Sequence, residues 1–124
     1  MDHDVTRAAL DQATAGLALL ARYVDALAAS PQLRCHCAIR AQLRRASLEA
    51  LASASNAVEE PAPDRRRRES LRSLGALYEL EVISRIARHA GALSSDERAA
   101  IGRMHTDITR LLRTEVTTGA SGVW

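Results

Sequence analysis

Apolar residues recur every three or four positions along most of the chain, which is the spacing of one face of an α-helix. Four stretches follow this rule, at residues 4–29, 32–58, 65–90 and 95–116. In the first of them the repeating apolar positions are Val5, Ala9, Ala13, Leu17, Leu20, Val24 and Leu27. The pattern predicts four amphipathic helices.

The segments between these stretches carry signals for helix ends. Ser30-Pro31 separates the first two, because proline suits the first turn of a new helix and disfavours helix in the residue before it. Residues 59–64 hold two further prolines. Gly91 is expected to end the third helix in a left-handed conformation, and Ser94 with Glu97 has the spacing of a capping box before the fourth.

Short connections between helices of similar length favour antiparallel neighbours. The sequence therefore predicts an all-α fold, an up-down-up-down antiparallel four-helix bundle. With 124 residues the chain has room for one core, so residues 1–116 are expected to form a single domain and residues 117–124 a flexible tail.

The third predicted helix has more apolar surface than one bundle stripe needs. One line holds Leu71, Leu74, Tyr78 and Val82, and a second holds Leu77, Leu80, Ile83 and Ala87. The second predicted helix also carries leucines off its main stripe. Either these helices lie deepest in the bundle, or their second faces pack against another subunit. The second alternative predicts a homo-oligomer.

Composition supports the helical prediction and narrows the class of protein. Aromatic residues make up only 2% of the chain and phenylalanine is absent, which argues against a β-sandwich or barrel. No apolar run approaches the ~20 residues of a membrane-spanning helix, so no membrane partner is expected. Asp2 and Asp4 stand where a secretory signal would be basic. A cytoplasmic location with Cys35 and Cys37 as free thiols is predicted.

The formal charge is only +2, but its distribution is uneven. Four arginines lie in a span that holds no acidic residue between Asp25 and Glu49, and unpaired arginines at this density bind phosphate oxygens well. The alternative is an ordinary solvated helix face. The candidate nucleic-acid-binding residues of this span are Arg34, Arg40, Arg44 and Arg45.

A second basic feature is the run Arg65, Arg66, Arg67 and Arg68. Successive helical residues turn by about 100°, so the run surrounds the helix axis and forms no single patch. Four acidic residues flank it, at positions 59, 60, 64 and 69. A solvated, self-neutralised helix start is favoured over a phosphate clamp, and the four arginines are kept as additional nucleic-acid-binding candidates.

The sequence offers little catalytic chemistry. On a helix the thiols of Cys35 and Cys37 would lie about 200° apart and could not chelate one ion, so neither a metal site nor a cofactor is predicted. Cys37 is expected to be buried and Cys35 partly exposed. Glu79 and Glu81 lie two residues apart, so acid–base catalysis would need a partner group from another element. We predict no enzymatic activity.

Four blocks of the sequence carry a resemblance to known proteins, in order and at matching spacing over residues 31–116. The blocks are residues 42–46, 77–81, 86–97 and 102–104. They resemble one bacterial family of four-helix-bundle proteins, which comprises the large-subunit ribosomal RNA intervening-sequence proteins and the accessory variability proteins of diversity-generating retroelements. The family's Asn-Ile-Ala-Glu-Gly block would fall on residues 53–57, which do not match, so the chain resembles a divergent member.

This resemblance implies a homopentamer of four-helix bundles. In the retroelement branch it also implies a basic surface that binds RNA and a partner reverse transcriptase. The sequence thus predicts an RNA-binding accessory or scaffold protein. The alternative is a protein–protein interaction module with no nucleic-acid role, and an enzyme or metal-binding bundle is the third hypothesis.

Overall fold

In the computed structural model the chain is all-α, which confirms the predicted class. The backbone is described for residues 2–121 and the side-chain surroundings for residues 6–117. Within these ranges every regular element is a helix. The helices are α1 (Asp2–Ala28), α2 (Pro31–Arg34), α3 (Cys37–Glu59), α4 (Pro63–His89) and α5 (Ser95–Ser121).

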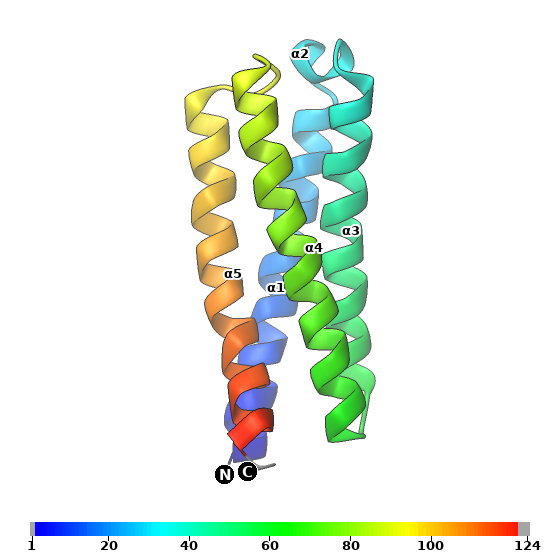
Figure 1. Cartoon of the computed structure of the whole chain (residues 1–124), viewed down its shortest axis with the longest axis vertical. Helices are drawn as coiled ribbons and strands as arrows, with labels where there is room; N and C mark the ends of the chain where they lie inside the picture. The colour runs from blue at the N-terminus through cyan, green and yellow to red at the C-terminus, as the bar shows by residue number, and fades with distance from the viewer. Residues whose placement is uncertain (1, 122–124) are drawn as a thin grey trace.

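Figure 1 shows the four long helices side by side, with both ends of the chain at the same end of the molecule. Helix α1 packs against α3 and α5, and α4 packs against the same two helices. The short α2 lies at the opposite end from the termini.

The turn between α4 and α5 is fixed by the residues that the sequence singled out. Gly91 has a φ of 79°, which only glycine adopts without strain, and the Ala92 N–H donates to the Ala87 carbonyl at 2.8 Å. The Ser94 N–H then donates to Glu97 Oε1 at 2.8 Å, while Ser94 Oγ accepts from the Glu97 N–H at 3.1 Å. The predicted capping box is therefore confirmed.

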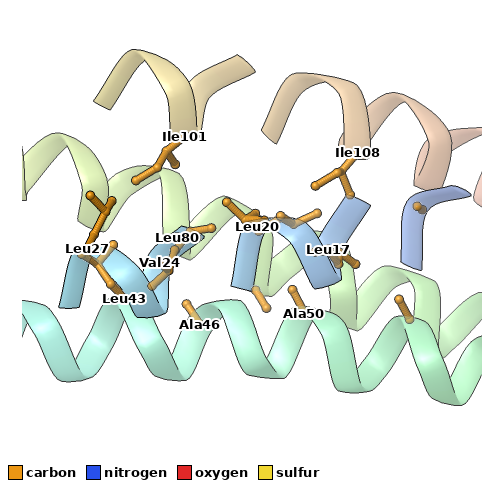
Figure 2. Close-up of a cluster of buried hydrophobic side chains, with 14 of the residues drawn as sticks. Leu17, Leu20, Val24, Leu27, Leu43, Ala46, Ala50, Leu80, Ile101 and Ile108 are labelled. Carbon is orange, nitrogen blue, oxygen red and sulfur yellow. The ribbon is translucent and has the colours of Figure 1, made fainter. Parts of the chain in front are cut away.

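The core pairs large side chains of α1 with small side chains of α3. Figure 2 shows Leu17, Leu20 and Val24 directly above Ala46 and Ala50. Alanines let the two backbones approach closely, so leucines fill the space without any aromatic residue in the core cluster. The contact between α1 and α5 is also close, because a Cβ on Gly16 would lie 3.0 Å from Ile108 Cγ1.

Helix α4 contributes both small and large side chains to the core. It buries Ser70, Ser73 and Ser84 beside Leu77 and Leu80. Its outer face carries large apolar side chains with exposed fractions of 43% to 66% at three positions and 37% at the fourth. We call this outer face the α4 stripe; it consists of Leu71, Tyr78, Val82 and Ile86.

Two predicted boundaries are wrong. The helix expected over residues 32–58 is divided, because the chain leaves helical geometry at His36, with φ −122° and ψ 67°. The expected tail is helical as far as Ser121, since no proline follows residue 116 and the glycine at 119 does not end α5. Residues 122–124 of that tail lie outside the described residues.

Candidate nucleic-acid interface

The corner between α1 and α3 places the first two candidate arginines. Ser30 Oγ accepts a hydrogen bond from the Leu33 N–H at 3.3 Å, and Pro31 occupies the first helical position of α2. The buried Leu33 side chain anchors this single turn to the core. Arg34 therefore ends α2 and Arg40 lies in the first turn of α3, so the two do not share one continuous helix as the sequence predicted.

Arg34 and Arg40 have no carboxylate partner among the described residues. The Arg34 side chain is exposed, and Arg40 is partly exposed with a buried Nε that has no hydrogen-bond partner. A guanidinium carries five N–H donors in a planar fork that matches two oxygens of a phosphate. These two residues retain the phosphate-binding capacity that the sequence suggested.

Arg44 and Arg45 are paired, contrary to the prediction. Arg44 Nη2 lies 3.1 Å from Asp25 Oδ1 of α1. Arg45 lies 2.9 Å from Glu49 and 3.1 Å from Glu79 of α4, and these carboxylates raise the pKa of Arg45 through their hydrogen bonds. The intervening sequence has no acidic residue, but folding brings carboxylates from other helices beside it.

The arginine run at the start of α4 is divided among different environments. Arg66 Nε lies 2.9 Å from Glu115 Oε1, and that carboxylate is buried, so this pair is part of the contact between α4 and α5. Arg67 is partly buried and its Nε has no partner, whereas Arg65 and Arg68 are exposed. Of the flanking acids that were expected to neutralise the run, none pairs with it within the described residues; Glu69 pairs with Arg72.

The predicted residues do not gather at one place. Arg34 and Arg40 lie at the end of the molecule that carries α2, whereas α4 begins at the other end (Figure 1). Among the described residues, Arg34 and Arg40 at the α2–α3 corner and Arg65 and Arg68 at the start of α4 have no carboxylate partner. The corner residues also lie in a span, residues 26–48, that contains no acidic residue, whereas acidic residues flank the α4 run on both sides. We call Arg34 and Arg40 the corner pair.

The structure also reveals a basic groove that sequence reasoning missed. A shallow groove of about 650 Å³ runs along the outer face of α5, and its lining includes Arg110 and Arg113. The signal in the sequence is the repetition of threonine and arginine at three- and four-residue steps over residues 106–117. Asp107 and Glu115 lie within that segment, so its two arginines are balanced by two acids in the sequence. In the structure Glu115 is buried beside Arg66 and does not line the groove.

The cysteines and the carboxylates singled out by the sequence make ordinary contacts. Cys35 and Cys37 are both free and exposed, so the predicted burial of Cys37 is wrong; α3 begins at this residue instead of passing through it. Glu79 pairs with Arg45, and Glu81 lies 2.8 Å from both Arg85 and Arg98. Among the described residues no group of three or more His, Cys, Asp or Glu side chains is arranged to hold a metal ion.

Comparisons of this chain with protein-family models, with curated proteins and with solved structures each give no significant match. The resemblance to the intervening-sequence protein family therefore stays a prediction from the sequence. Within the described part of the chain, no helix has both the length and the apolar character needed to cross a membrane.

Proposed function

We propose that this protein is a non-enzymatic, cytoplasmic RNA-binding accessory or scaffold protein. In this proposal its up-down-up-down four-helix bundles assemble into a homo-oligomer, with five subunits as the family resemblance implies. RNA and, in the retroelement setting, a reverse transcriptase are its partners.

The corner pair is the observation that carries the RNA-binding part of the proposal. Arg34 and Arg40 have no carboxylate partner among the described residues, and α2 and the first half of α3 contain no acidic residue. Forming a contact with a phosphate would therefore break no ion pair. Arg65 and Arg68 are the remaining exposed, unpaired members of the predicted set.

Binding of this kind is directed to the RNA backbone. Sequence readout of single-stranded RNA uses aromatic side chains on which bases stack. The sequence supplies only Tyr23, Tyr78 and Trp124, and Tyr23 is partly buried against the core. We expect contacts to phosphates and little discrimination among base sequences.

Fluorescence anisotropy with a labelled structured RNA tests the proposal. The protein is treated with nuclease, repurified, and measured at low and at near-physiological salt. The variant Arg34→Gln/Arg40→Gln is expected to weaken binding roughly tenfold or more, since hydrogen bonds to charged groups are lost at two positions. Arg7→Gln/Arg103→Gln removes the same charge from exposed positions on α1 and α5 and serves as the control.

Equal weakening in both variants would indicate general attraction of a polyanion, and the assignment of the corner pair would then be wrong. Absence of RNA binding by the unmodified protein at both salt concentrations would contradict the RNA-binding function itself.

The α4 stripe favours a second candidate function, the protein–protein interaction module. Four large apolar side chains share one exposed helix face, and contiguous apolar patches often mark protein–protein interaction sites. In the leading proposal this face packs against another copy of the chain. In the second candidate it binds a different protein, and nucleic acid has no role. RNA binding in the anisotropy experiment distinguishes the two.

A further inference from the structure

The groove on the outer face of α5 combines positive charge with hydroxyl groups. Its lining residues recur at helical spacing, so they share one face of the second half of α5. The groove has a volume of about 650 Å³. The lining residues that matter for the argument are His105, Thr106, Thr109, Arg110, Arg113 and Thr114.

The two arginines of the groove are available to a ligand. Arg113 is exposed and has no ion-pair partner among the described residues. Arg110 Nη2 lies 3.3 Å from Asp107 Oδ1, but both side chains are more than 70% exposed. Exposed pairs of this kind contribute little free energy, so Arg110 can exchange Asp107 for another anion at small cost.

One groove arginine, Arg113, is among the charges that act on His105. Burial is the main cause that lowers the pKa of His105, and the charges of Arg98, Arg113 and Arg85 lower it further, while Glu81 acts in the opposite direction. Because Glu81 is itself held by Arg85 and Arg98, its carboxylate is already engaged. Of the three arginines that act on His105, Arg113 is the one without a carboxylate partner among the described residues.

One hydroxyl in the groove lacks a partner. The hydroxyls of Thr106 and Thr114 donate to the carbonyl oxygens of Gly102 and Arg110 at 2.9 and 3.1 Å. Thr109 Oγ1 is buried and makes no hydrogen bond. A buried hydroxyl without a partner lowers stability. Because threonine in a helix occupies two χ1 rotamers, rotation about χ1 can give the Thr109 hydroxyl a partner.

We propose that this groove binds a phosphate group, with Arg110 and Arg113 as the charged ligands and the Thr109 hydroxyl as a neutral donor. Adjacent arginines at i and i+3 present several N–H donors to the oxygens of one anion. The proposal is independent of the corner pair and does not rest on RNA binding, because free phosphate and a nucleic-acid backbone offer the same oxygens.

Titration of the ¹⁵N-labelled full chain with inorganic phosphate at constant ionic strength tests this site. Sodium chloride at the same ionic strength is the reference. We expect chemical-shift changes concentrated at residues 105–114 and at the side-chain Nε–H groups of the two groove arginines. Arg110→Gln/Arg113→Gln is expected to weaken phosphate binding roughly tenfold or more, and Arg7→Gln/Arg103→Gln to leave it unchanged.

Thr109→Val separates a binding role from a structural one. Valine has nearly the shape of threonine and removes a hydroxyl that has no hydrogen bond, so the melting temperature should not fall. Phosphate binding should nevertheless weaken severalfold. An unchanged phosphate affinity in Thr109→Val would remove Thr109 from the site.

A repeat of the titration with a short oligoribonucleotide distinguishes the sources of the phosphate. RNA binding that is lost in Arg34→Gln/Arg40→Gln but kept in the groove variants would support the proposed function, and the absence of phosphate shifts at the groove would overturn the inference. The reverse pattern would support the groove and contradict the role of the corner pair.

Discussion

Helices α1 and α4 lie in the same bundle and have the same length, but they differ in how many large apolar side chains they leave exposed. Helix α1 directs Leu17 and Leu20 into the core. Helix α4 buries three serines and exposes the α4 stripe. Among the described residues α1 exposes one large apolar side chain, Leu19, whereas α4 exposes the four residues of the stripe. This difference makes α4 the helix that we propose to pack against a further partner.

The largest expected effect concerns the core face of α1. Leu20→Ala removes a fully buried side chain and leaves a cavity among the alanines of α3, which are too small to fill it. We expect the free energy of unfolding to fall by about 2–5 kcal/mol. Urea denaturation followed by circular dichroism measures it, and a loss below about 1 kcal/mol would contradict the packing described for α1.

A smaller effect is expected on the buried face of α4. Ser73 Oγ donates a hydrogen bond to the Ala50 carbonyl of α3 at 2.7 Å, whereas Ser70 Oγ is buried without a partner. Ser73→Ala should therefore lower the free energy of unfolding by about 1 kcal/mol, while Ser70→Ala should leave it unchanged or raise it. The two variants make the same chemical change one turn apart, so equal effects would refute the assigned hydrogen bond.

The smallest effect on helical structure is expected on the outer face of α4. A change there is also the sharpest test of the difference between α1 and α4. Ile86→Gln changes a side chain that is 53% exposed, so helical content should be unchanged. If the α4 stripe packs against another subunit, sedimentation equilibrium will give a lower mass for this variant than for the unmodified protein.

Leu19→Gln on α1 is the matched control, since Leu19 is 61% exposed and lies outside the α4 stripe. A reduced mass in both variants, or in neither, would mean that the stripe has no special role in self-association.

Local signals in the sequence were sufficient for the helices and most of their ends. The apolar period marks α1, α4 and α5, and the glycine and capping-box residues between α4 and α5 act within a few positions of each other. The sequence did not predict the break at His36. Ser30-Pro31 indicates that a helix begins there, but it does not indicate that this helix, α2, ends after a single turn. The buried Leu33 holds that short turn through a tertiary contact.

The candidate site was only partly predictable, because tertiary contacts also decide which arginines are paired. Sequence alone determined that arginines are dense and acids absent over residues 26–48, and that four amphipathic helices would form. Only the tertiary structure decided that Asp25 and Glu79 neutralise Arg44 and Arg45, and that Arg66 pairs with Glu115. Helical periodicity acts over one or two turns, whereas the partner of a surface charge is chosen by which helix packs beside it.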